Sequence, residues 1–120
     1  VVGSDVNGVG SVREGLAGAS YGVDKAIFGY GMPYGSGQTN ITNLVSNTGV
    51  VATDTTGVGT ARRYLAAAGY GGDKALFGYG TNNTTGTNIT NLVSNTGVVA
   101  SDSTGVGTLR DTLAGASYSS

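Results

Sequence analysis

Apolar positions along the chain form short clusters rather than a helical stripe. Val50-Val51 and Val98-Val99 are β-branched pairs, and within Ile41–Asn47 apolar and polar residues alternate only in part. Glycine, asparagine and threonine separate the clusters, as at Ser46-Asn47-Thr48-Gly49. Short β-branched runs between such turn-forming residues are typical of strands joined by tight hairpins. The pattern therefore predicts an all-β chain.

The clusters recur. Over Thr39–Thr60 and Thr87–Thr108, 22 positions can be compared and only Thr53/Ser101 and Thr55/Ser103 differ, so 20 match at an offset of 48. Val1–Gly10 resembles the segment 49 positions later, and Asp24–Gly31 returns as Asp73–Gly80. Self-similarity at a fixed period marks a repeat architecture. The extra residue of the first period falls where Met32–Gly37 replaces Thr81–Thr85, and a length change confined to one segment marks a surface loop.

Each period divides into four expected strands. The first is Val12–Gly22, Ala61–Gly71 and Leu109–Ser119; the second is Lys25–Gly31 and Lys74–Gly80; the third is Ile41–Asn47 and Ile89–Asn95; the fourth is Val50–Thr55, Val98–Ser103 and, at the front, Val1–Val6. The 120 residues then form a single array. Residues 1–10 are an orphan fourth strand, 11–59 are repeat 1, 60–107 are repeat 2, and 108–120 are an orphan first strand.

The first strand of each repeat is ambiguous in sequence. Ala61–Gly69 alone has the composition of a helix. Its first counterpart carries Gly15 and Gly18, and two glycines in a helix interior cost roughly 2 kcal/mol relative to alanine. Since all copies share one structure, a strand is the preferred interpretation. Small residues would let these backbones crowd near an axis.

Composition narrows the function. Among 120 residues there are 23 glycines, one proline, no cysteine and no histidine, so zinc sites of the usual type, cysteine nucleophiles and a Ser-His-Asp triad are excluded. The formal net charge is -1, with no basic cluster, which argues against nucleic acid as a partner. No apolar run approaches the roughly 18 residues needed to span a bilayer. No cofactor is implied, and the chain is expected not to be an enzyme.

The order of features resembles the kelch motif of β-propellers. A period of 48–49 residues with four strands fits one propeller blade. Arg62 opens its strand as the kelch arginine does, and Ala75–Gly80 resembles the kelch aliphatic-aromatic run, with Gly-Tyr-Gly in place of a double glycine. Leu92–Gly97 occupies the place of the third strand and its turn, but the usual tryptophan is absent.

The long motifs DKAIFGYG and NLVSNTGVVATDTTGVGTAR more closely resemble glycine-rich repeat proteins of environmental, phage-associated sequences. This resemblance implies tandem kelch-like blades and a virion appendage or surface-binding role. A β-solenoid or interwound fibre is the alternative fold. Two blades cannot close a ring, so either the chain belongs to a longer propeller or its unpaired edges associate with other copies.

Repeated polar residues suggest several sites. Asp5, Asp54 and Asp102 each begin an Asp-x-(Asn/Thr)-Gly turn, for which turn capping is preferred over a partial calcium loop. Asp24/Lys25 and Asp73/Lys74, with one arginine per repeat, either lock each blade or line a pocket. The charged residues are repeat-equivalent, whereas glycoside hydrolysis needs two inequivalent carboxylates.

Aromatic and amide side chains are the candidate ligand-binding residues. A tyrosine ring can stack on the apolar face of a sugar while amides bond its hydroxyl groups. The residues are Tyr30, Tyr34, Tyr79, Asn82 and Asn83. The alternative for the tyrosines is packing between blades. The expected function is a non-enzymatic structural module of a tail fibre or similar extracellular appendage that recognises a surface glycan, with a ligand-free self-assembling filament subunit or a free lectin as alternatives.

Overall fold

The computed structural model describes residues 1–118, and within them it contains strands and turns but no helix. Repeat 1 provides β1 (Arg13–Glu14), β2 (Ala17–Tyr21), β3 (Lys25–Gly29), β4 (Met32–Pro33) and β5 (Thr42–Val45). Repeat 2 provides β6 (Ala66–Tyr70), β7 (Lys74–Gly78) and β8 (Thr90–Val93). The all-β prediction is confirmed, and the alanine-rich Ala61–Gly69 is not helical.

Each repeat folds into one antiparallel three-stranded sheet. The strand order is β2-β3-β5 in repeat 1 and β6-β7-β8 in repeat 2, and the two sheets share the same register. Ile27 pairs with Leu44 as Leu76 pairs with Leu92. Beside them, β1 pairs with β4, and repeat 2 reduces this pairing to a single bridge between Arg63 and Thr81.

The expected fourth strand is not a regular strand. In Val50–Thr55 only two isolated bridges form, Thr42 with Thr55 and Val45 with Val51, and repeat 2 has the equivalent pair of bridges. Side chains supply the remaining bonds of this segment, as described below for Asp54. The expected strand Val1–Val6 has no regular structure and is exposed. Leu109–Ser119 makes one bridge, at Arg110, and its last residue lies outside the described part of the chain.

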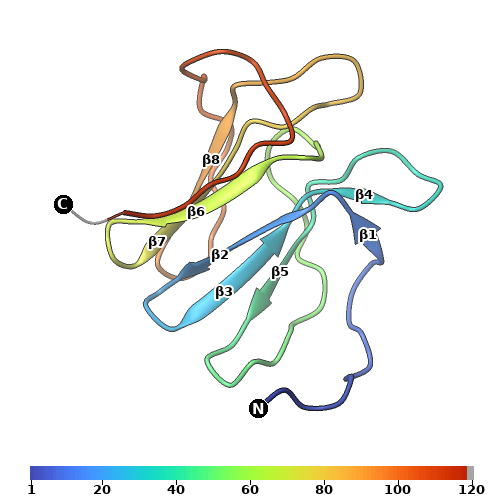
Figure 1. Ribbon diagram of the computed structural model, residues 1–120, viewed down its shortest axis with the longest axis vertical. Coiled ribbons are helices and arrows are strands. Elements are labelled where there is room, and N and C mark those ends of the chain that lie inside the picture. The colour runs from blue at the N-terminus through green and yellow to red at the C-terminus, as the bar shows by residue number, and fades with distance from the viewer. Residues whose placement is uncertain (119–120) are drawn as a thin grey trace.

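The first strands of the repeats lie side by side. In Figure 1, β2 runs next to β6, and the C-terminal segment runs along the other side of β6. Backbone bonds join them at equivalent positions: Tyr64 N donates to Gly15 O, and Thr112 N donates to Tyr64 O, both at 2.8 Å. All three residues have positive φ, which only glycine adopts without strain. Residues 1–118 do not close into a ring or barrel.

The core lies between the two sheets. It is formed by buried residues of both repeats: Tyr21, Ile27, Tyr30, Leu65, Ala75, Phe77 and Val93. Because successive side chains of a strand point to opposite faces, each sheet offers two apolar faces and uses one of them here. In each repeat we call the face that carries Phe28 or Phe77 the front face, and the opposite face, which carries Ile27 or Leu76, the rear face.

Candidate functional site

The contact between the rear face of repeat 1 and the front face of repeat 2, here called the joint, holds most of the core. The Phe77 ring is fully buried against Tyr30, with ring centroids 5.0 Å apart. It fits because residue 29 is a glycine: a Cβ added there would lie 2.8 Å from Phe77 Cζ. The joint therefore depends on a bulky residue of one repeat entering a glycine gap of the other.

A buried arginine anchors repeat 2 in the joint. Arg62 has no exposed surface, and its guanidinium lies 4.8 Å above the Tyr30 ring. Its Nε donates to Tyr79 O at 2.7 Å, and its Nη1 donates to Thr60 O at 3.0 Å. Burial lowers the pKa of Arg62 and raises the pKa of Tyr30. A charge removed from water in this way needs its hydrogen bonds, so Arg62 is a structural group.

Arg13 repeats this arrangement in repeat 1. Its Nε donates to Tyr30 O at 2.8 Å, its Nη1 to Ser11 O at 3.2 Å, and its Nη2 to Asn43 Oδ1. Among residues 1–118, the side chain of Arg110, the third member, makes only the Nη1 bond to Thr108 O, at 3.1 Å, and its guanidinium lies 4.0 Å above the Tyr79 ring. The three arginines thus occupy equivalent positions, but Arg110 is not enclosed by a repeat as Arg13 and Arg62 are.

Two of the repeated aspartates tie the ends of their repeats together. Asp54 accepts from Ser11 N at 3.2 Å and from Ser11 Oγ at 2.7 Å, and Asn43 Nδ2 donates to it at 2.9 Å. The bond from Asn43 is the main reason that the pKa of Asp54 is lowered. Its Oδ1 also lies 4.0 Å from Arg13 Nη1. Both oxygens of this carboxylate are therefore engaged by the protein's own donors.

Asp102 has the same environment in repeat 2. It accepts from Thr60 N at 3.0 Å, Thr60 Oγ1 at 2.6 Å and Asn91 Nδ2 at 2.9 Å. Burial opposes its ionisation, but these hydrogen bonds outweigh burial and lower its pKa. Asp5, in the N-terminal segment, is exposed. Within residues 1–118 no cluster of three acidic side chains could hold a metal ion.

The remaining charged pairs lie at the turns between the first and second strands. Asp24 pairs with Lys25 and Asp73 with Lys74, each at 2.8 Å, and Asn47 and Asn95 donate to the same aspartates. These bonds, first that from the lysine, lower the pKa of each aspartate. A pocket of about 410 Å³ lies between these turns, lined by Tyr70 and Tyr118 among others. This pocket could not be predicted from the sequence, because its walls come from three separate segments.

The candidate sugar-binding tyrosines have different environments. Tyr30 is fully buried, and its hydroxyl donates to Val58 O at 2.9 Å, so no ring face is open to a ligand. Tyr79 is half-buried and donates to Val106 O at 3.0 Å, while Arg110 covers its ring. Tyr34, by contrast, is 95% exposed on the loop that follows β4. Tyr34 is therefore exposed, unlike Tyr30, which lies in the joint, and Tyr79, which occupies the equivalent position of repeat 2.

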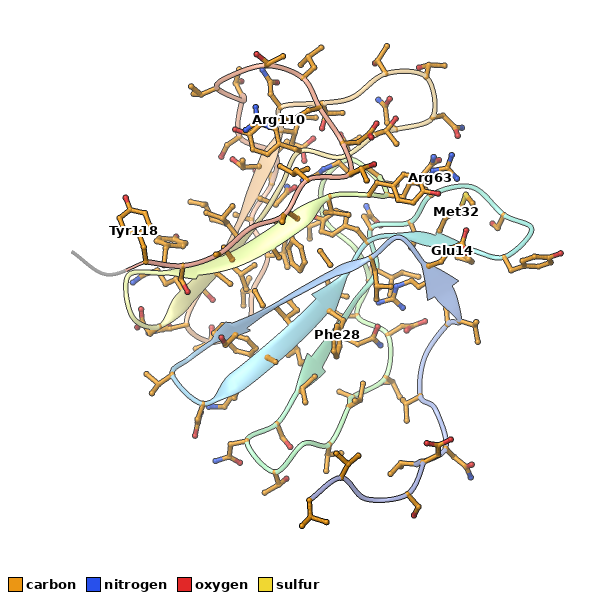
Figure 2. All side chains as sticks on the ribbon, viewed as in Figure 1. Glu14, Phe28, Met32, Arg63, Arg110 and Tyr118 are labelled. Carbon is orange, nitrogen blue, oxygen red and sulfur yellow. The ribbon has the colours of Figure 1, made fainter. Side chains whose placement is uncertain are left out.

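The two loops that differ between the repeats meet at one edge of the molecule. Gln38 Nε2 donates to Asn83 Oδ1 at 2.9 Å, and both loops project to the right in Figure 1. At their base, Arg63 Nη1 contacts Met32 Sδ at 3.0 Å, and these two side chains lie together in Figure 2. The Nε of Arg63 is buried and has no hydrogen-bond partner among the residues that the structure describes. We call this surface, which also includes Tyr34, Asn82 and Asn83, the loop edge.

No protein-family model matches the chain, and no curated protein sequence matches it. Within residues 1–118 there is also no helix long and apolar enough to cross a membrane. The class that the structure defines is an all-β tandem-repeat protein with antiparallel sheets.

Proposed function

We propose that the chain is a non-enzymatic structural repeat module of an extracellular appendage, such as a virion tail fibre, and that its loop edge recognises a surface glycan. The repeats are kelch-like blades whose first strands lie nearest the axis. The observation that carries the recognition role is the meeting of the two variable loops through Gln38 and Asn83. The length difference between the repeats falls in these two loops, where Met32–Gly37 replaces Thr81–Thr85, and the loops come together at one exposed edge.

The chemistry of the loop edge suits a sugar. Tyr34 presents a nearly free ring, and a carbohydrate stacks its apolar face on such a ring. Asn82 and Asn83 are exposed, and each amide offers both donors and an acceptor for hydroxyl groups. Neutral amides and the near-zero net charge favour an uncharged saccharide over a nucleic acid.

A glycan array probed with the purified chain tests this proposal. We expect binding to a limited set of saccharides, strongly reduced by Tyr34→Ala and by Asn82→Ala. Val98→Ala serves as the control. Val98 is exposed in repeat 2 but lies outside both loops, so this variant should bind normally. Absence of binding on the array, or binding that survives both loop substitutions, would reject the loop edge as a glycan site.

A ligand-free filament subunit is the second candidate function. It is favoured by the open apolar faces at the two ends of the array, where the residues equivalent to those of the joint stand without partners. In that case the loop edge has no ligand, and the chain acts only by assembly.

A further inference from the structure

The front face of repeat 1 and the rear face of repeat 2 lie at the two ends of the array. Each carries the residues that form one half of the joint between the repeats. Phe28 occupies in repeat 1 the position that Phe77 occupies in repeat 2, within the same Lys-Ala-x-Phe-Gly-Tyr-Gly sequence. Phe77 is fully buried, whereas Phe28 is 44% exposed. The front face of repeat 1 is therefore a docking face like that of repeat 2, without an occupant. It forms one wall of an open groove of about 970 Å³ whose other wall is the N-terminal segment.

The rear face of repeat 2 carries the complementary half. A Cβ at Gly29 would collide with Phe77, but a Cβ at Gly78 would meet only Thr90 Cγ2 at 3.4 Å and Leu76 Cδ1 at 3.6 Å, both from its own repeat. The gap that receives an aromatic ring in the joint is thus unfilled at Gly78. Leu92 on this face is 42% exposed, whereas its counterpart Leu44 is packed against the core.

We propose that a second copy of this chain docks its repeat 1 on the rear face of repeat 2, so that Phe28 of one molecule enters the gap at Gly78 of another. The internal joint is the template for this contact. The contact joins two different surfaces, the one that carries Phe28 and the one at Gly78, so it is head-to-tail and leaves a free face at each end. Head-to-tail contacts of this kind continue into chains or close into rings.

The C-terminal segment holds the place of the incoming first strand. Leu109–Tyr118 reads LRDTLAGASY, and Val12–Tyr21 reads VREGLAGASY, with Leu-Ala-Gly-Ala-Ser-Tyr shared in full. The segment already bonds repeat 2 as a first strand does, since Gly80 N donates to Arg110 O at 3.0 Å. Docking exchanges it for Val12–Tyr21 of the second copy, which forms the same contacts.

The incoming strand suits this position better than the segment that it replaces. Thr112 adopts φ 56°, a left-handed conformation that is strained for a β-branched residue, and the equivalent residue of the second copy is Gly15. Within residues 1–118 the side chain of Arg110 has one hydrogen bond, to Thr108 O, whereas the side chain of Arg13 has three hydrogen bonds, all within its own repeat. The exchange therefore relieves strain and adds the burial of Phe28.

This proposal rests on the structural-module part of the proposed function and is independent of glycan binding. Sedimentation velocity and light scattering of the 120-residue chain across a concentration series test it. We expect species larger than one chain that increase with concentration. Phe28→Asp and Gly78→Ala, on opposite faces, should each reduce the mass to that of a monomer.

Matched controls separate docking from loss of fold. Val98→Asp introduces a charge at a position that is 65% exposed. Its counterpart in repeat 1, Val50, is 64% exposed although the joint has formed there, so docking should not bury Val98. Gly37→Ala adds a Cβ that meets nothing within 4 Å. Both variants should associate like the unmodified chain, and thermal melts check that all four are folded.

Mixing the two blocked variants gives the decisive outcome. The Phe28→Asp chain retains an intact rear face and the Gly78→Ala chain an intact front face, so together they should form a one-to-one pair and nothing longer. A monomeric unmodified chain at all concentrations, or association that neither variant reduces, would overturn the proposal. Either result leaves the glycan array free to succeed or fail separately.

Discussion

Gly29 and Gly78 allow a matched measurement of what the joint contributes. The two glycines follow Phe28 and Phe77 at the same position of the same strand, but only Gly29 lies in the joint. In Gly29→Ala the new Cβ would lie 2.8 Å from Phe77 Cζ and 2.9 Å from Thr42 Cγ2, well inside the contact distance of about 3.5–4.0 Å. Phe77 cannot swing away, since it is fully buried against Tyr30.

The expected effects differ in sign. Overpacking of this kind destabilises a core by about 1–3 kcal/mol, so Gly29→Ala should lower the free energy of unfolding by that amount. Gly78→Ala meets only ordinary contacts and restricts the unfolded chain, so it should be neutral or stabilising by up to about 1 kcal/mol. Urea unfolding of both variants, at concentrations where the chain is monomeric, provides the comparison. Equal destabilisation by the two substitutions would refute the assigned role of Gly29.

Two further predictions follow from the charged groups. Arg62→Lys loses the planar guanidinium that bonds Tyr79 O and Thr60 O, so it should destabilise the fold by about 2 kcal/mol or more. Arg110 is exposed, so Arg110→Lys should change stability by no more than about 0.5 kcal/mol. Thermal and urea unfolding measure both variants, and equal effects would contradict the prediction. The lowered pKa values of Asp54 and Asp102 stabilise the fold above the unfolded aspartate pKa of about 3.9, and this stability is lost as the pH falls through the folded values. With no histidine in the chain, the unfolding free energy should be flat from about pH 5 to 8 and fall below about pH 4, less steeply in Asp102→Asn; a fall centred near pH 6, or an unchanged slope in that variant, would contradict it.

The sequence predicted the strands from signals that are local. Lys25–Gly31 and Lys74–Gly80 were expected as strands, and β3 and β7 occupy all but their last two residues. The choice of strand over helix for Ala61–Gly69 came from comparing copies, because a single copy favours a helix. The fourth strand was overestimated, since Asp54 bonds Ser11 and Asn43 where a ladder had been expected.

Burial could not be predicted in the same way. Tyr30 and Tyr79 share the local sequence Phe-Gly-Tyr-Gly, yet Tyr30 is buried and Tyr79 is half-buried. The difference arises from Phe77 and Arg62, which pack on Tyr30 from the next repeat. The bond between Gln38 and Asn83 also joins residues 45 positions apart, and no period in the sequence indicates it.

The bonds between Ser11 and Asp54 have a consequence for how such a chain can change in length. They span 43 positions and join the start of repeat 1 to its last segment, and Thr60 and Asp102 do the same across 42 positions in repeat 2. Each repeat thus ends beside the point at which it began. A duplicated stretch of the gene that encodes one repeat would therefore insert a self-closed unit, and the residues on either side would keep their neighbours. Growth by copying requires no compensating substitution elsewhere.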